Sequence, residues 1–192
     1  MRKIAWLGAA LLLVVALVWV VQANGEEAKK AEEQEHGFIG ALSCKACHKS
    51  EAKGDQYGKW LASPHAHAYQ SLLTDESKKI AKELGIEVAP EEAAQCLKCH
   101  VTAWDAKAEL FGKKYDKIEG VSCESCHGPA ADWKIAHMKD VEKAMTLGMI
   151  APAEELCLSC HNDESPTFKE FKFEEAMAVV AHPNPKKAGE GE

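Results

Sequence analysis

Cysteine and histidine are the residues of this chain that could do chemistry, and they recur in one pattern. The sequence C-x-x-C-H occurs four times, with a histidine directly after each second cysteine. The four motifs use all eight cysteines of the chain. In chain order they are Cys44, Cys47 and His48; Cys96, Cys99 and His100; Cys123, Cys126 and His127; and Cys157, Cys160 and His161. This pattern is typical of covalent attachment of a c-type haem.

The spacing within each motif suits this chemistry. Cysteines three residues apart on a helical turn lie on one face, so both sulfurs can form thioethers along one edge of a porphyrin. The histidine that follows lies beside the second cysteine, where a ring nitrogen can ligate the iron on the proximal side. We therefore predict four haem c groups as cofactors, held by eight cysteines and four proximal histidines.

Three other interpretations of the cysteines were weighed. Two C-x-x-C knuckles could bind structural zinc, but zinc does not explain the histidine after every motif. An even number of cysteines permits a disulfide framework in an exported protein. A redox-active C-x-x-C of the thioredoxin type is not expected to recur four times. Only haem attachment explains the whole pattern.

The remaining histidines are candidate distal ligands. Nine histidines less the four proximal ones leave His36, His65, His67, His137 and His182. Four six-coordinate haems need four distal ligands, so the number allows two histidines at every iron. On a helix, residues two apart are separated by about 200°, so His65 and His67 are not expected to serve the same haem. His36 lies in a polar segment and is the least expected ligand.

Two methionines were considered as thioether ligands. Met138 and Met177 lie near histidine candidates, and a methionine ligand would raise the reduction potential of its haem. We prefer packing roles for both, because methionine is a common filler of irregular cores.

The segments between the motifs predict a mostly α-helical fold with little or no β-sheet, in which the haems form the core. Pro64 follows Ser63 as in a helix N-terminus, and Gly85 and Gly148 follow apolar periodic segments as helix stops. We expect helices over 64–73, 75–84, 91–96, 132–147 and 173–181, with 132–147 the clearest. No segment shows the alternation of a β-strand.

The N-terminus predicts export. Arg2 and Lys3 precede an apolar run from Ile4 to Val21, and a small-residue site ends at Ala23. Residues 1–23 are therefore either a signal peptide or a membrane anchor, with possible membrane attachment through residues 4–21. We expect a polar linker over 24–37, a tetrahaem domain over 38–183 and a disordered tail over 184–192. Whether residues 1–23 are a cleaved signal peptide or a membrane anchor, we expect the haem domain to be periplasmic or extracellular.

The charge balance limits the partners. The formal net charge is −7, and haem propionates would add further negative charge. Nucleic acid is therefore excluded as a partner. We expect other redox proteins instead, such as multihaem cytochromes and quinol-linked or terminal reductases. Lys98, beside Cys99, and the acidic surface would tune potential and docking.

Several segments resemble one family. Residues 120–129 (Gly-Val-Ser-Cys-Glu-Ser-Cys-His-Gly-Pro) resemble the third haem site of the tetrahaem cytochrome c-554 family. Residues 60–68 (Trp-Leu-Ala-Ser-Pro-His-Ala-His-Ala) resemble its Trp-x-x-Ser/Thr-x-His-Ala-x-Ala segment. Residues 96–101 and 171–177, followed by His182, continue in the family order. The family comprises electron carriers associated with hydroxylamine oxidation, with relatives in metal- and nitrogen-respiring bacteria. The resemblance therefore implies anaerobic or nitrogen-linked electron transport, with haems in close pairs.

The resemblance also implies a ligand set. It assigns the distal histidine His182 to the haem of His48, His65 to that of His127, and His137 to that of His161. In the best-known member the second haem, here that of His100, lacks a distal histidine. This chain differs by the additional His67 and by a shorter stretch between the third and fourth motifs. Whether His67 or His36 closes the second haem is left open.

Three functional hypotheses follow. The first is an electron-transfer protein without enzymatic activity, because iron with two histidine ligands has no free position for substrate. The second is a haem enzyme whose open second haem acts on small nitrogen oxides or hydroxylamine. The third is a subunit of an extracellular haem filament, in which His36 completes the haem of a neighbouring copy.

Overall fold

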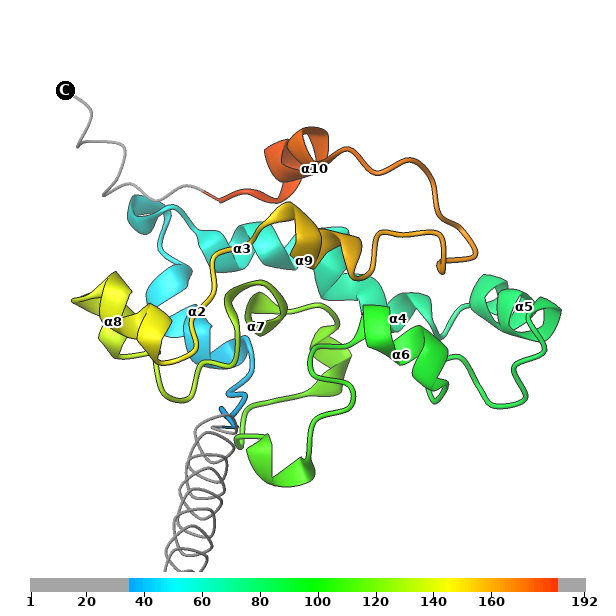
Figure 1. Ribbon diagram of the computed structural model, residues 1–192, viewed down its shortest axis with the longest axis horizontal. Coiled ribbons are helices and arrows are strands. Elements are labelled where there is room, and N and C mark those ends of the chain that lie inside the picture. Colours follow the sequence, from blue (N-terminus) through cyan, green and yellow to red (C-terminus); the bar gives the residue numbers. More distant parts are fainter. Residues whose placement is uncertain (1–34, 183–192) are drawn as a thin grey trace, which may run out of the picture. The chain divides into compact units, whose positions relative to one another are not determined.

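The computed structural model describes residues 35–182, and this part of the chain is helical (Figure 1). No β-strand occurs in it, only an isolated bridge between Phe38 and Phe111. This confirms the prediction of a mostly α fold. The predicted leader (1–23) and the tail (184–192) lie outside the described residues, as does most of the linker. Within residues 35–182, no helix is long and apolar enough to cross a membrane.

The helices are short and are joined by long connections. The α-helices are α2 (Leu42–His48), α3 (Gln56–Leu61), α4 (Ala68–Ser71), α5 (Asp75–Glu83), α6 (Ala94–His100), α7 (Cys123–His127), α8 (Val141–Thr146), α9 (Glu154–Leu158) and α10 (Phe173–Val180). Turns of 3₁₀ helix occur at Glu51–Lys53, Pro64–His67, Ala108–Leu110, Lys117–Glu119 and Ala136–Met138.

The predicted helices over 75–84 and 173–181 are confirmed by α5 and α10. In α5 the Thr74 hydroxyl accepts the N–H of Ser77, at 3.2 Å, and Gly85 ends the helix with φ of +70°. The glycine stop is one of the signals from which the helix was predicted, whereas the Thr74 cap was not identified from the sequence. The helix expected over 64–73 is present in two pieces, a 3₁₀ turn and then α4.

The prediction of one helix over 132–147 is wrong. The chain turns at 131–135, forms a single 3₁₀ turn at Ala136–Met138 and only then begins α8. The break lies at Asp140, whose backbone is extended and whose carboxylate accepts the N–H of Lys143, at 2.8 Å. An aspartate that caps the following turn competes with helix continuation, and the apolar periodicity alone did not reveal it. The helix expected over 91–96 likewise begins later, at Ala94.

The core of protein side chains is small. Among the described residues no large side chain is fully buried, and the cluster around Trp133 includes only Ala130 and Ala144 as other buried members. Large apolar side chains such as Ile135 and Met138 remain more than half exposed. A chain of this length normally buries a substantial core. Apolar surface of this kind is what flat porphyrin rings could cover.

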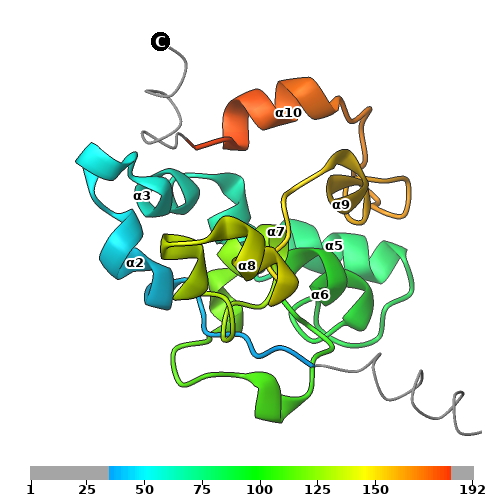
Figure 2. The same cartoon turned by 60° about the vertical axis from the view of Figure 1, so that its left-hand side comes forward.

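The residues around the third motif form the structural centre of this part of the chain. In Figures 1 and 2, α7 lies among helices from both earlier and later parts of the chain. The Val121 N–H donates to the His65 carbonyl at 3.0 Å, and the Trp60 indole N–H donates to the Val121 carbonyl at 2.9 Å. The Gly120 carbonyl accepts the backbone N–H of Thr102 at 2.9 Å. Segments that are distant in sequence are thus joined through residues 118–128.

Gly120 permits this close packing. Its backbone has φ of +70° and ψ of −135°, and an added Cβ would lie 2.7 Å from the His65 carbonyl oxygen. Both the dihedral angles and the contact exclude a side chain at this position.

We predict that Gly120→Ala lowers the free energy of unfolding by about 3 kcal/mol, through backbone strain and steric overlap. Gly85→Ala is the matched control, because Gly85 has the same φ but nothing within 4 Å of an added Cβ. It should cost only about 1 kcal/mol, from strain alone. Denaturant unfolding of the haem-loaded protein measures both values, and equal losses would contradict the packing argument.

Candidate cofactor sites

The first three motifs lie at the ends of helices. Helices α2, α6 and α7 each terminate at the motif histidine, so each pair of cysteines lies on one helical face. In the fourth motif α9 ends at Leu158, and a turn carries the rest, with the His161 N–H donating to the Cys157 carbonyl at 2.9 Å. The predicted placement on a helix is confirmed for three motifs. In the fourth motif only Cys157 lies on a helix, and Cys160 and His161 lie in the turn that follows.

The geometry argues against structural zinc and against a disulfide framework. All eight thiols are free, although every cysteine lies within the described residues. Within residues 35–182 no group of three or more His, Cys, Asp or Glu side chains is arranged to hold a metal ion. A structural zinc site needs four such ligands at once. The paired knuckles that zinc would require are therefore not formed.

The structure brings three motif histidines to face three other histidines. The ring centroids are 5.9 Å apart for His48 and His137, 6.0 Å for His161 and His65, and 5.8 Å for His127 and His182. Two imidazoles that ligate one metal from opposite sides, through bonds of about 2 Å, have centroids about 6 Å apart. By contrast, the stacked rings of Phe111 and Tyr115 are 4.1 Å apart. The three spacings therefore fit an iron between each pair.

These pairs differ from those that the family resemblance implied. His137 faces the first motif instead of the fourth, His65 faces the fourth instead of the third, and His182 faces the third instead of the first. The three non-motif histidines are the expected ones, but each has a different partner. Their partners depend on how long connections fold back, and local sequence carries no signal for this.

Hydrogen bonds fix the rings of two motif histidines. Nδ1 of His48 lies 3.2 Å from Gln56 Oε1, and Nδ1 of His100 lies 2.7 Å from the Ala68 carbonyl oxygen. An N–H at Nδ1 that donates to these oxygens leaves Nε2 as the free lone pair. Such second partners orient the ring of a metal-ligating histidine. Gln56 and Ala68 were not identified from the sequence, because neither is close to a motif.

Three histidines of the facing pairs are kept neutral by their surroundings. Burial lowers the pKa of His65, with the nearby His161 as a second cause. Burial, followed by His182, lowers the pKa of His127, and burial also lowers that of His182. Neutral imidazole is the form that binds a metal.

The second motif lacks a facing histidine. No ring of another described histidine lies against His100, which contacts Ala68 and Ser71 through Nδ1. His67 is exposed and faces no other histidine within residues 35–182. His36 instead pairs with Asp132, with Nδ1 2.6 Å from the carboxylate. The structure thus brings neither candidate to His100.

The four motifs are neighbours in two pairs. The Cys44 thiol lies beside that of Cys123, and this contact is the main cause of the lowered pKa of Cys44. Burial, followed by the nearby Cys160, raises the pKa of Cys99 to about 11. The first motif therefore adjoins the third, and the second adjoins the fourth. Cys157 and Cys160 also act on Cys126, which links the two pairs.

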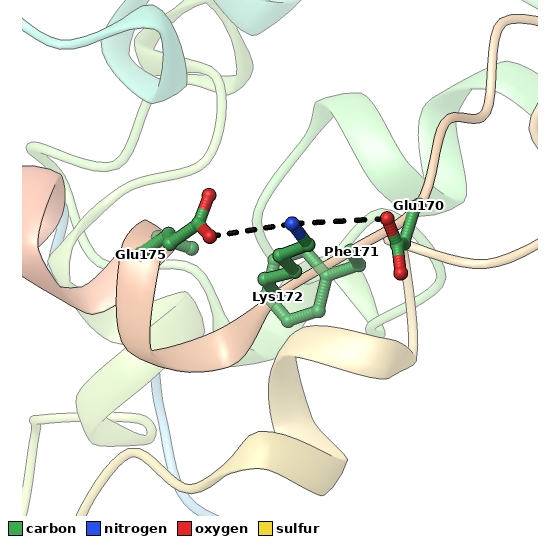
Figure 3. A pocket seen from close by; sticks show the side chains of 5 residues that line it. Glu170, Phe171, Lys172 and Glu175 are labelled. Carbon is green, nitrogen blue, oxygen red and sulfur yellow. Dashed lines mark ion pairs between the residues drawn. The ribbon is translucent and has the colours of Figure 1, made fainter.

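An aromatic ring supports the fourth site. Phe171 stacks on His161 with centroids 4.8 Å apart and an interplanar angle of 19°. A pocket of about 310 Å³ lies at Phe171 and is shown in Figure 3. There Lys172 lies between Glu170 and Glu175, with N–O distances of 3.9 and 3.4 Å. No histidine or cysteine lines this pocket, so it is not one of the four motif sites.

The comparisons with known proteins agree with one another. Residues 43–128, which include the first three motifs, match the family described as cytochrome c554 and c-prime. The chain is similar to members of this family. The cytochrome c-554 of Nitrosomonas europaea is 28% identical over 151 residues, which are 70% of this chain and 62% of that protein. The resemblance found in the sequence to the cytochrome c-554 family is confirmed.

A solved structure supports the fold. The reduced state of cytochrome c554 from Nitrosomonas europaea matches with a TM-score of 0.50 and 24% identity, covering 82% of this chain and 84% of that one. At this identity the match concerns the fold alone, and it agrees with the helical architecture found here. Similarity to c-type cytochromes implies covalently bound haem c. The three histidine pairs, the free thiols and the small core are features that fit this cofactor.

We predict that haem stays on the polypeptide when the purified protein is extracted with acidified organic solvent. Thioether bonds survive this treatment, whereas iron–histidine bonds do not hold haem in a denatured chain. Haem absorbance in the aqueous protein fraction measures the outcome. Transfer of the haem into the solvent would contradict covalent attachment through the motif cysteines.

Proposed function

We propose that the chain is an exported tetrahaem c-type cytochrome that relays electrons between redox partners. Residues 1–23 would direct export or anchor the protein, 24–37 would form a linker, 38–183 the haem domain and 184–192 a tail. Each of the four motifs would hold one haem c through its two cysteines and its histidine. Periplasmic or extracellular placement follows from covalent attachment outside the cytoplasmic membrane.

The spacing of the histidine rings is the observation that supports this function best. Three pairs, each joining a motif histidine to a non-motif histidine, have centroids 5.8 to 6.0 Å apart. Iron held by two histidines has no position left for a substrate. When bound, haem supplies a one-electron couple between ferric and ferrous iron. The chain's own role at these sites would then be to bind the iron through both histidines of a pair and to set its potential.

The arrangement of the motifs supports a relay. The contact of Cys44 with Cys123 and the proximity of Cys99 to Cys160 would place four haems in two adjoining pairs. The influence of Cys157 and Cys160 on Cys126 connects the third site to the fourth. Electrons would therefore pass from the haem of the first motif to that of the third, then to that of the fourth and finally to that of the second. The partners would be other redox proteins, among them multihaem cytochromes and quinol-linked or terminal reductases.

The pairing can be tested by removing one distal candidate. In His137→Ala the haem of His48 should lose one histidine ligand, because the ring of His137 lies 5.9 Å from that of His48. In the ferric protein, one haem of the four should change from low-spin to high-spin. The number of haems per chain should stay the same. Absorption and EPR spectra of the purified protein measure both quantities.

His36→Ala is the matched control, since His36 faces Asp132 and no motif histidine. Its spectrum and its oligomeric state should equal those of the wild type. A spectral change in His36→Ala, or an unchanged spectrum in His137→Ala, would contradict the proposed ligands. A wild-type polymer that His36→Ala disperses would favour the filament subunit.

A second candidate function rests on the second motif. Because no described histidine faces His100, its haem would have an open position for a small ligand. Such a site could act on nitric oxide, nitrite or hydroxylamine. This would make the protein a haem enzyme with three relay haems and one reactive one.

We predict that nitric oxide changes the spectrum of one haem, that of His100. His67→Ala should leave both the resting spectrum and the response unchanged, because His67 is exposed and faces no other histidine within residues 35–182. If His67 closes the site, the wild type will not respond and His67→Ala will. The absence of a response in both proteins would eliminate the enzymatic function.

A further inference from the structure

A buried carboxylate lies inside the third motif. Glu124 follows Cys123 directly and is only 3% exposed. A charged side chain is rarely buried to this extent without partners, because it loses its hydration. Neither haem attachment nor axial ligation requires a glutamate at this position, since the two residues between the cysteines can vary.

The partners of Glu124 are backbone N–H groups. Its two oxygens accept the N–H of Ile39, at 3.0 and 3.1 Å, that of Gly40 at 2.8 Å and that of Ala130 at 2.7 Å. A carboxylate is an acceptor only, so donors on both oxygens fit its ionised form. Ile39 and Gly40 belong to the segment that leads into the first motif.

Glu119 extends the same contact along the chain. Its oxygens accept the N–H of Ala41 at 2.8 Å and that of Leu42 at 3.3 Å. Helix α2 has no side-chain cap from its N-cap residue, Ala41, and Glu119 accepts the N–H groups of Ala41 and Leu42 at this helix start. Four consecutive N–H groups, at residues 39–42, are thus bound by two carboxylates next to or inside the third motif.

The backbone of this segment is shaped for the contact. Gly40 has φ of +78°, and a Cβ there would lie 2.2 Å from the Lys114 carbonyl oxygen. Only glycine fits between Lys114 and Glu124 at this position. The segment also brings Cys44 beside Cys123, where the negative charges of Glu124 and Glu119 act on the Cys44 sulfur.

We propose that Glu124 and Glu119 form a carboxylate clamp that holds the first haem site against the third and lowers the reduction potentials of both haems. The proposal rests on the proposed function, because it requires haems at these motifs. A buried negative charge stabilises the more positive ferric iron, and the low local polarity strengthens the effect. Burial raises the pKa of Glu119, opposed by the N–H bonds of Ala41 and Leu42, so the charge argument depends mainly on Glu124.

The clamp positions the haems and lowers their potentials without contacting the iron. It joins chain segments that are distant in sequence, so it sets the spacing of one haem pair.

The second and fourth motifs have no buried carboxylate of this kind. There Lys98 pairs with Glu164, but both side chains are exposed, by 38% and 63%. Water and salt screen exposed charges, so this pair has little influence on potential.

A spectroscopic redox titration of Glu124→Gln tests the clamp. The substitution keeps the shape of the side chain and removes its charge. We expect the midpoint potentials of the haems of His48 and His127 to rise and those of the other two haems to stay at their wild-type values. Glu155→Gln is the matched control, because Glu155 lies two residues before Cys157 but is exposed. It should leave all four potentials unchanged.

The outcomes separate the clamp from the proposed function. Wild-type protein with fewer than four haems would overturn the proposed function. Four haems in the wild type and in Glu124→Gln, with equal potentials, would overturn the clamp alone. If Glu124→Gln does not yield protein with four haems, Glu119→Gln takes its place. A smaller rise at the same two haems then supports the clamp, because Glu119 carries the lesser share of the charge, and unchanged potentials overturn it.

Discussion

Pairs of histidines that are distant in sequence are the constraint on which this structure depends. The helices are short, and the longest described one, α5, has nine residues. Helices of this length are not stable by themselves in water. The protein core around Trp133 is too small to order so many connections. Iron held between His48 and His137, and between the other two pairs, would act as a cross-link between these segments.

The residues around the third motif organise the rest of the chain. They receive hydrogen bonds from the first motif's leading segment, from Trp60 and from Thr102. Gly120 and Glu124 make this possible in opposite ways. Gly120 lets a neighbouring backbone approach, whereas Glu124 supplies acceptors for backbone groups that have none. The third site is therefore central both in the fold and in the proposed order of electron transfer.

The sequence predicted what local signals encode. The motifs, the mostly α fold and the family resemblance follow from residue types and spacing, as do α5 with its Gly85 stop and α10. The helix expected over 132–147 was wrong because Asp140 can continue a helix or begin one, and its capping bond decides between them. Apolar periodicity does not distinguish these cases.

The histidine partners could not be predicted for a different physical reason. His65, His137 and His182 were identified as candidates, but which motif each one faces depends on the path of the whole chain. Glu124 was part of the quoted motif, yet its contacts with Ile39 and Gly40 join residues far apart in sequence. Only the folded structure brings such residues together.

The low-temperature EPR spectrum of the oxidised wild-type protein tests the central account most directly. The ring planes of His48 and His137 are 19° apart, whereas those of the other pairs are 68° and 64° apart. Nearly parallel axial rings give an ordinary rhombic low-spin signal, and nearly perpendicular rings give a more anisotropic one with a larger maximum g value. The account predicts one rhombic haem, two strongly anisotropic haems and one high-spin haem at His100. Four low-spin haems, or high-spin iron at more than one site, would contradict it.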